Sequence, residues 1–474
     1  MKMKKSSEIS QTLSFYLFVV GVFLIIVCQD IFSNGMFLDG VIYSTVSKNL
    51  ADGLGTFWNP YFSSTWSDFH EHPPLAFGIQ SVFYALLGES RYVDKIYSLF
   101  TIAIAGFVIM RIWKTMGYRH GWLPLFIWII TPTVFWASYN NVLENTMTVF
   151  TSLSVLFYLI NQDSKKYIFI ILSGFMLALG FLTKGFVAFF PWTFPFLLWL
   201  ILKQKSCSKM AIDSAGLIFF TISPLILVCL VSASARVSLH KYIDNQVIDS
   251  IRHAVTVNSR FYIVERLLFE LVPAAVLSSL LLIRAYIRKT PSILPKENIK
   301  KALVFVILGL TGVLPIMISM KQSGFYIIPA YPFFAIGAGI LVYPSIDYLF
   351  LKINYESKWF FIFKWTGYLL FFSGIVLSVY FSDRFSRDSV KIKDIYALIP
   401  EIPKGSIINI NPEMDSDFSL HAYFGRFENI SLDPDLKNKR DFLLIKNEFY
   451  SDTLRTNYEI IKVGTVDYKL LRKK

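Results

Sequence analysis

A set of ionisable residues stands beside long apolar runs in this sequence, where a membrane-spanning chain would carry its chemistry. The set comprises Asp39, Glu71, His72, Glu144, Lys184, His253 and Lys321. A charged side chain beside an apolar span is costly to keep and usually has a task. Glu144 and Lys184 are the most informative, because each occupies a connection of only a few residues between apolar runs. These residues are the first candidates for a functional site.

Two carboxylates, Asp39 and Glu144, could divide the work of a reaction between them. One could accept a proton while the other orients a substrate or binds a metal. A structural alternative exists for both, because an acidic residue at the start of a helix can cap its free N–H groups. Asp39 stands just before VIYSTVSKNL, and Glu144 precedes a run that begins at Asn145. The residues alone leave catalysis and helix capping open.

Cations at a membrane edge form the second group of candidates. Lys184 lies in FLTKGF and Lys321 in SMKQSGFYIIPAYP. Ammonium groups can hold a phosphate as point charges, or they can snorkel toward anionic lipid. Arg260, close to His253, could belong to a second phosphate-binding group or to an ordinary amphipathic surface. Tyr326 could line a site or belong to the aromatic belt of the membrane interface.

The sequence Glu71-His72-Pro73-Pro74 holds two ionisable groups against a rigid bend. Together with His253, Glu71 and His72 could ligate a divalent metal. No local ligand spacing supports this, so a satisfied or solvent-exposed histidine is the simpler interpretation. The three cysteines form neither a CxxC pattern nor a disulfide framework. No other cofactor is predicted.

The composition predicts a polytopic α-helical membrane protein. Of 474 residues, 54% are hydrophobic and only 17% are charged, whereas soluble domains carry about 25% charge. Apolar runs recur at the length that a spanning helix needs, roughly 20 residues. The net charge of +13 could indicate a nucleic-acid-binding protein. Most of the excess lies in short loops between apolar runs, which indicates the positive-inside bias and argues against that class.

The apolar runs predict about eleven spans. They lie at 13–29, 93–113, 121–138, 145–160, 167–183, 186–202, 211–231, 266–284, 301–319, 327–346 and 359–380. Basic residues such as Arg111, Lys165 and Lys203 occupy alternate loops. This pattern predicts a cytoplasmic N-terminus and a first span that is not cleaved, because no small-x-small site follows it.

Residues 1–381 are therefore predicted to form a membrane domain, with a first non-cytoplasmic loop at 30–92 and a later one at 232–265. Within the first loop, residues 73–88 are apolar but too short to span, so we expect a juxtamembrane helix along the interface. Residues 382–474 carry short alternating runs, at 406–410 and 441–445, between Pro, Gly and Asp-Pro punctuation. We expect a small soluble α/β domain there, on the non-cytoplasmic side.

Several short motifs, taken in order, carry a resemblance to a known family. Asp39 and Tyr43 in FLDGVIYSTVSKNLADG resemble a first-loop acidic motif with its amphipathic helix, and Glu71-His72-Pro73-Pro74 resembles the exit of that loop. NVLEN at 141–145 resembles a second acidic position, and FLTKG at 181–185 resembles a Leu-Thr-Lys-Gly turn. The segment 319–329, with Lys321 and Tyr326, resembles a late Ser, Lys, Tyr-Ile-x-Pro motif. Over roughly residues 10–346 the chain resembles the GT-C membrane glycosyltransferases, in the branch of the lipid A aminoarabinose transferase and the protein O-mannosyltransferases.

Three positions depart from the pattern of that family. Gly40 follows Asp39 where the first motif usually has a second acid, and Glu144 stands where the second acid is often Asp. His72 stands where the aminoarabinose transferase has Lys. The departures concern the sugar and the acceptor, and leave the class of reaction unchanged.

The resemblance implies transfer of a sugar from a polyprenyl-phosphate carrier to a lipid, glycan or protein acceptor, at the periplasmic face of the bacterial inner membrane. Asp39 is then expected to be the general base, Glu144 to orient the acceptor or the sugar, and Lys184, Lys321 and Arg260 to bind the donor phosphate. The expected pocket residues are Tyr43, Glu71, His72, His253 and Tyr326. A transporter or flippase of a lipid-linked glycan is the alternative; the charges gather at one membrane edge and no inverted repeat is visible, which disfavours it.

Overall fold

The computed structural model describes residues 2–288 and 295–474 and divides the chain into two compact units. Unit 1 comprises Met1–Cys28, Leu99–Ser138 and Leu143–Tyr380. Unit 2 comprises Gln29–Ser98, Tyr139–Val142 and Phe381–Lys474. Each unit is therefore assembled from segments that lie far apart in the sequence.

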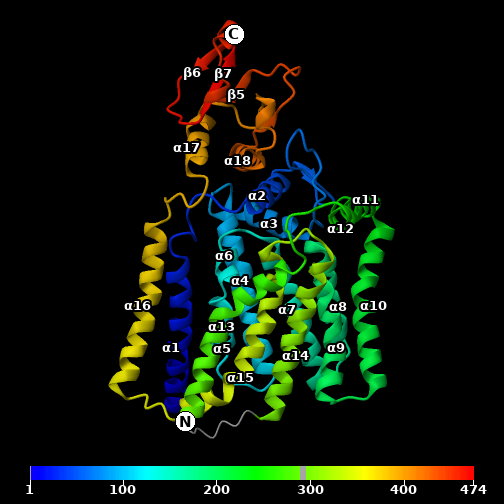
Figure 1. Cartoon of the computed structure of the whole chain (residues 1–474), viewed down its shortest axis with the longest axis vertical. Coiled ribbons are helices and arrows are strands. Elements are labelled where there is room, and N and C mark those ends of the chain that lie inside the picture. Colours follow the sequence, from blue (N-terminus) through cyan, green and yellow to red (C-terminus); the bar gives the residue numbers. More distant parts are fainter. Residues whose placement is uncertain (1, 289–294) are drawn as a thin grey trace. The chain divides into compact units, whose positions relative to one another are not determined.

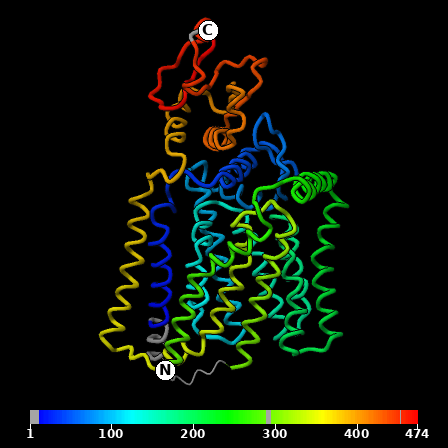
Figure 2. Tube along the Cα trace, in the orientation of Figure 1, coloured from blue at the N-terminus to red at the C-terminus, as the bar shows by residue number. Residues whose placement is uncertain are grey.

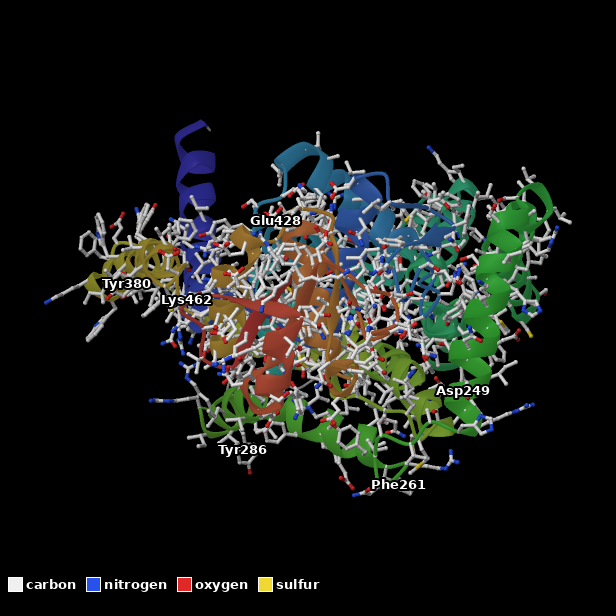
Figure 3. All side chains as sticks on the ribbon, turned by 90° about the horizontal axis from the view of Figure 1, so that it is seen from above. Asp249, Phe261, Tyr286, Tyr380, Glu428 and Lys462 are labelled. Atoms are coloured by element: carbon white, nitrogen blue, oxygen red, sulfur yellow. The ribbon has the colours of Figure 1, made fainter. Side chains whose placement is uncertain are left out.

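Unit 1 is a bundle of helices, and its long members run side by side in Figure 1. Among the described residues, seven helices are long and apolar enough to cross a bilayer. These are α4 (Val93–Thr115), α7 (Leu143–Ser164), α10 (Cys207–Val231), α13 (Tyr262–Ile287), α14 (Lys296–Val313) continued by η4 (Leu314–Ile318), η5 (Gly324–Ala330) continued by α15 (Tyr331–Leu351), and α16 (Lys358–Tyr380). Large apolar side chains such as Tyr286 and Tyr380 are exposed and point outward at the edge of the bundle in Figure 3, as expected for helices that face lipid.

The other predicted spans coincide with helices that are shorter, interrupted, or apolar over only part of their length. They are α1 (Lys2–Val27), which is apolar over Gln11–Val27, α5 (Trp122–Ile129), α6 (Pro132–Ala137), α8 (Ile168–Lys184), and the series η1 (Phe186–Thr193), α9 (Phe194–Leu197) and η2 (Leu198–Leu202). Proline explains the interruptions, because it lacks an N–H and disfavours helix in the residue before it. Pro132 begins α6, and Pro191 lies inside η1. The prediction of a polytopic α-helical membrane protein is confirmed.

Close helix packing in unit 1 depends on small residues, as is common between membrane helices. In the trace of Figure 2, α1 and α16 run alongside one another. A Cβ added at Gly21 would lie 2.7 Å from the backbone nitrogen of Phe371, and one at Gly374 would lie 2.5 Å from Cβ of Leu24. Neither glycine of this helix pair could therefore carry a side chain without separating the two backbones.

The segment between α10 and α13 contains α11 (Ala233–Tyr242), η3 (Ile243–Ile248) and α12 (Asp249–Arg252). Figure 3 labels Asp249 and Phe261, which mark the later part of this segment at the edge of unit 1. It corresponds to the predicted loop at 232–265, and the structure shows that much of this loop is helical.

Unit 2 begins with α2 (Leu38–Ala51), a two-stranded hairpin of β1 (Gly55–Thr56) and β2 (Asn59–Pro60), and α3 (Leu75–Leu87). Helix α3 covers the segment predicted as a juxtamembrane helix, and at 13 residues it is shorter than the roughly 20 residues of a span. Helix α2 packs against α3. Nine residues of α2 are buried, including the polar Ser44, Lys48 and Asn49, so this helix is enclosed by polar contacts.

The last part of unit 2 is the predicted small α/β domain, and its presence is confirmed. It contains α17 (Ser389–Leu398), η6 (Ile399–Glu401), η7 (Pro412–Met414), α18 (Phe418–Glu428), η8 (Asn447–Phe449) and η9 (Asp452–Thr456). The five strands of its sheet are ordered β4 (Ser431–Asp433), β3 (Ile407–Ile410), β5 (Phe442–Lys446), β7 (Tyr468–Lys473) and β6 (Tyr458–Ile461). Strand β3 is parallel to β4 and β5, and β7 is antiparallel to β5 and β6.

Candidate functional site

The predicted residues Glu144 and Lys184 meet in unit 1. Glu144 lies in the first turn of α7 and Lys184 in the last turn of α8. The Lys184 ammonium donates a hydrogen bond to Oε1 of Glu144. Glu144 is fully buried and Lys184 is 9% exposed, so neither snorkelling nor simple helix capping describes their contact. Each charge also stands at the helix end whose dipole favours it.

Aromatic rings complete the surroundings of Lys184. Its ammonium lies 4.8 Å from the ring centre of Tyr326 and 5.3 Å from that of Phe325. Both rings belong to η5, and Trp136 of α6 packs on Phe325 with ring centres 5.9 Å apart. A cation over aromatic faces gains about 0.5–2 kcal/mol, more where it is desolvated. The predicted residue Tyr326 is thus brought together with Glu144 and Lys184.

The turn after Lys184 explains the glycine of the FLTKG motif. Gly185 has φ +82°, and a Cβ there would lie 1.7 Å from the hydroxyl oxygen of Tyr242. Only glycine therefore allows both the left-handed backbone and the approach of this phenol. The Tyr242 hydroxyl donates to the backbone oxygen of Lys184 at 3.5 Å, and burial raises the pKa of Tyr242, which keeps this donor protonated.

Lys321 and Arg260 belong to a neighbouring assembly in unit 1. The Lys321 ammonium donates to Oε1 of Gln246 at 2.6 Å. The Arg260 guanidinium donates to the backbone oxygens of Met317, at 3.1 Å, and of Ile318. Buried Gln322 joins these segments, because its amide donates to the backbone oxygen of Arg260 at 3.1 Å.

His253 lies in the same loop but on an exposed surface. Its Nδ1 is 2.8 Å from Asp249 Oδ1, and the histidine side chain is 72% exposed. This is the expected geometry of an i,i+4 surface pair.

Asp39 lies in the first turn of α2, in unit 2, and is half-buried. The helix begins at Leu38, so the N-cap position belongs to Phe37. The capping alternative considered for Asp39 therefore does not describe its position. An acidic side chain in the first turn still interacts favourably with the helix dipole.

The backbone on both sides of Asp39 is held by two asparagines of unit 2. The N–H of Phe37 donates to Oδ1 of Asn140 at 2.7 Å, and Nδ2 of Asn141 donates to the backbone oxygen of Gly40 at 3.0 Å. A Cβ at Gly40 would lie 2.0 Å from the backbone oxygen of Asn140. No second acid fits at position 40 against this backbone.

Tyr43 and His72 are also brought together in unit 2. The Tyr43 hydroxyl lies 3.0 Å from Nε2 of His72, and the ring centres are 5.6 Å apart. Phe77 also packs on Tyr43, with ring centres 5.7 Å apart, whereas Glu71 is exposed. Among the described residues, no group of three or more His, Cys, Asp or Glu side chains could hold a metal ion. A metal held by Glu71, His72 and His253 therefore stays a prediction from the sequence.

Several residues of these assemblies are not among the site residues predicted from the sequence. Phe325, Tyr242 and Gln322 in unit 1 had no distinguishing pattern, because aromatic and polar residues are frequent in this chain. In unit 2, Asp94 and Lys95 are buried in the first turn of α4. These two residues could have been identified from the sequence, because two adjacent charged residues stand at the start of an otherwise apolar run.

Comparisons with known proteins show which family model and which solved structures this chain is similar to. Residues 71–228 match the family model described as dolichyl-phosphate-mannose-protein mannosyltransferase. The whole chain has the fold of the GT-C membrane glycosyltransferases, so the resemblance noted in the sequence is confirmed at the level of the fold. No curated protein matches the chain by sequence.

Among solved structures, the chain is similar to ArnT from Cupriavidus metallidurans. The crystal structure of that protein bound to undecaprenyl phosphate superposes with a TM-score of 0.66 at 14% identity, covering 96% of this chain and 97% of that one. Its apo structure gives a TM-score of 0.62 at 14% identity, covering 99% and 98%. The likeness extends over both units and includes the small C-terminal domain.

Proposed function

We propose that this protein is a glycosyltransferase that moves a sugar from a polyprenyl-phosphate carrier to a lipid, glycan or protein acceptor. The carrier is proposed because the similar ArnT structure holds undecaprenyl phosphate. The setting proposed is the periplasmic face of the bacterial inner membrane, with the N-terminus in the cytoplasm and residues 382–474 in the periplasm. The observation that carries the proposal is the buried Glu144–Lys184 pair beside Tyr326, on the GT-C fold.

The proposed reaction is a direct displacement at the anomeric carbon. The Asp39 carboxylate accepts the proton of the acceptor hydroxyl as its oxygen attacks. The new bond joins this oxygen to the anomeric carbon, and the bond from that carbon to the carrier phosphate breaks. The carrier phosphate leaves with the electron pair, and Glu144 orients the acceptor or the sugar.

Cations must stabilise the negative charge of the leaving phosphate. Lys184, Lys321 and Arg260 are proposed for this role. Two features support them: Lys184 is held by a carboxylate and two aromatic rings, and Arg260 is tied to the 317–322 segment that carries Lys321. Tyr43, Glu71, His72, His253 and Tyr326 are proposed to line the donor and acceptor pocket.

The test is transfer by the purified protein in detergent. A panel of undecaprenyl-phosphate-linked pentoses and hexoses is offered with an envelope extract from cells that lack the protein, and products are followed by mass spectrometry. We expect one donor to be consumed and a glycosylated acceptor to appear. Detergent has no compartments, so a flippase would consume nothing. Failure of every donor, combined with movement of a lipid-linked sugar across sealed vesicles, would contradict the proposal.

A further inference from the structure

Helix α18 of the C-terminal domain packs directly on α2 within unit 2. The hydroxyl of Thr45 donates to the backbone oxygen of Ala422 at 2.9 Å, and the Lys48 ammonium donates to Oδ1 of Asn429 at 2.6 Å. A Cβ at Gly425 would lie 2.8 Å from the methyl carbon of Thr45. The C-terminal domain therefore contacts successive positions of the helix that begins beside Asp39.

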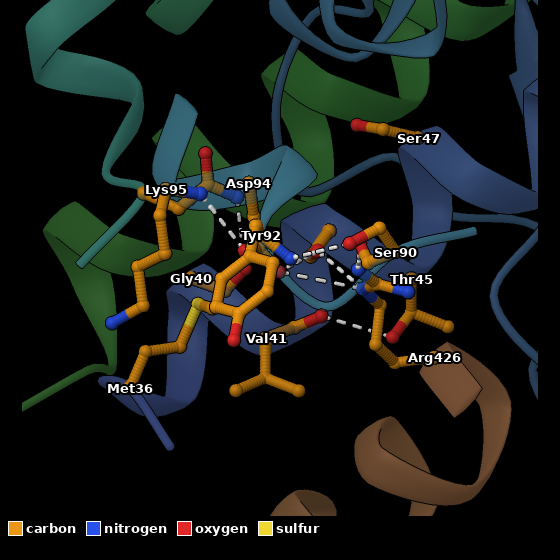
Figure 4. A network of polar contacts seen from close by, with 12 residues as sticks. Met36, Gly40, Val41, Thr45, Ser47, Ser90, Tyr92, Asp94, Lys95 and Arg426 are labelled. Atoms are coloured by element: carbon orange, nitrogen blue, oxygen red, sulfur yellow. Dashed lines mark hydrogen bonds and ion pairs between the residues drawn. The ribbon is translucent and has the colours of Figure 1, made fainter. Parts of the chain in front are cut away.

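Arg426 of α18 lies at the centre of this contact, and Figure 4 shows its hydrogen bonds. Its Nε donates to the hydroxyl of Ser44 at 3.0 Å and lies 3.4 Å from Oδ2 of Asp94. Its Nη2 donates to the backbone oxygen of Ser90 at 2.9 Å, and its guanidinium lies 4.8 Å from the ring centre of Tyr84. One side chain thus joins α18 to α2, α3 and the start of α4.

The participants of this network are enclosed. Arg426 is 3% exposed, Asp94 2% and Ser44 0%. The Ser44 hydroxyl also donates to Asp94 at 2.8 Å, so Ser44 on α2 is held from both sides. A buried ion pair contributes little net stability, but loss of one partner is strongly destabilising because an unpaired buried charge remains. The pair therefore strongly favours one arrangement of these helices over others.

The rigid geometry of α2 carries this constraint to Asp39. Ser44 lies five residues after Asp39, which is about 7.5 Å along a helix that rises 1.5 Å per residue. The contacts of α18 with Ser44, Thr45 and Lys48 fix the direction of the α2 axis. The axis in turn sets the direction in which the Asp39 carboxylate points from the first turn of α2. A displacement of about 1 Å at a reacting group can cost about 10²-fold in rate.

We propose that the C-terminal domain is a positioning element for α2, and that Arg426 is the positioning residue through which it acts on Asp39. The proposal rests on the proposed function only in the role given to Asp39. It assigns a task to residues 382–474, which carry none of the proposed catalytic groups. The contact between Arg426 and Asp94 has to be intact for the reaction, although neither residue is proposed to touch the substrate.

The test compares full-length variants in detergent: Arg426→Gln, Asp94→Asn, the double variant, and Arg440→Gln as the matched control. Arg440 pairs with Asp433 at 2.9 Å in the same domain, with 35% of its side chain exposed. Amide hydrogen exchange of residues 38–51 reports the order of α2. Steady-state transfer, with the undecaprenyl-phosphate-linked sugar that the wild type consumes, reports kcat and KM.

We expect each single variant to speed exchange in α2 and to lower kcat by about 10²-fold, with KM for the donor changed less than kcat. The double variant removes both buried charges and should recover slow exchange. Arg440→Gln should leave α2 exchange and kcat at wild-type values. Wild-type exchange in α2 together with wild-type kcat in Arg426→Gln would overturn the proposal.

Arg426→Lys covers the case in which Arg426→Gln does not fold. Lysine keeps a charge for Asp94 but lacks the planar fork that reaches Ser44 and Ser90 together. We expect a folded protein with intermediate kcat; a kcat equal to that of the wild type would count against positioning by Arg426. If the wild type transfers no sugar at all, the proposed function fails, whereas the exchange comparison still decides whether Arg426 orders α2.

Discussion

The ammonium group of Lys184 contacts the carboxylate of Glu144 where the end of α8 meets the start of α7, and both side chains are buried. Forty positions separate the two residues in the sequence. The aromatic rings of Phe325 and Tyr326 face the same ammonium. Removing only one partner of a buried ion pair is strongly destabilising, because the other charge stays buried without a partner. A double-mutant cycle can therefore measure the interaction between the two residues.

Lys184→Met is expected to lose about 3–5 kcal/mol of stability, because the carboxylate of Glu144 stays buried without this cation. The double variant Lys184→Met with Glu144→Gln should regain most of that loss, yet neither variant should transfer sugar. Denaturant unfolding in detergent and the transfer assay measure the two effects.

Lys205→Met is the control. It breaks the pair with buried Asp213, so it should lower stability while the folded fraction still transfers sugar. Transfer by Lys184→Met at the wild-type rate would contradict the proposed role of Lys184.

Asp39→Asn is expected to lower kcat by about 10²–10⁴-fold, the usual contribution of a general base. Stability should change by less than about 1 kcal/mol, because Asp39 is half-buried and does not cap α2. Asp68→Asn is the matched control, an acid of the same loop that lies 3.6 Å from His70, and it should transfer normally. An Asp39→Asn variant with near-normal kcat would remove the assignment of Asp39 as the base.

Gly40→Ala is expected to impair transfer by displacing the backbone beside Asp39. The added methyl would lie 2.0 Å from the backbone oxygen of Asn140, so either α2 or the 139–142 segment has to shift. Overpacking of this kind costs about 1–3 kcal/mol. The control is Gly464→Ala, where a Cβ meets nothing within 4 Å. Thermal unfolding and kcat are measured for both, and equal values for the two variants would show that the close approach is unimportant.

The stability of the C-terminal domain is expected to fall on mild acidification through His421. The imidazole is buried between Trp66, with ring centres 4.8 Å apart, and Asp415. Burial lowers the pKa of His421 below its ordinary value, despite the opposing effect of Asp415 and Asp417. As the pH falls, the histidine of the unfolded chain therefore binds its proton at a higher pH than the histidine of the folded chain. The contribution of His421 to stability is fully present above about pH 6.5. This contribution is lost as the pH falls from there toward the pKa of the folded state.

The measurement is the thermal midpoint of unfolding of the full-length protein in detergent, taken between pH 8 and pH 5. His421→Phe keeps an aromatic ring in contact with Trp66 but removes the titration. The wild type should lose stability relative to this variant as the pH falls below about 6.5. Parallel pH curves for the two proteins would show that His421 does not contribute.

Local patterns in the sequence predicted much of the fold. The runs at 406–410 and 441–445 became β3 and β5, and the apolar segment 73–88 became the short helix α3. These elements depend on apolar periodicity and on proline and glycine, which act over a few residues. The interruption of predicted spans by Pro132 and Pro191 follows from the same local rules.

The candidate site was predicted only as a set of residues. Glu144, Lys184 and Tyr326 were each placed at the end of an apolar run, and the structure brought them into one assembly. Arg426, by contrast, gave no signal as one of many basic residues in the chain. Its partner Asp94 lies 332 positions away, and nothing local to either residue records that they meet.

The sequence by itself determined a multi-pass helical membrane protein, a small C-terminal α/β domain and the types of chemical group available, because apolar run length and alternation are local properties of a chain. The tertiary structure alone decided which of those groups pair. A buried charge needs a partner of opposite charge. In both pairs described here, that partner comes from a distant part of the chain, so its position depends on how the helices pack. Glu144 with Lys184, and Arg426 with Asp94, are therefore products of the fold.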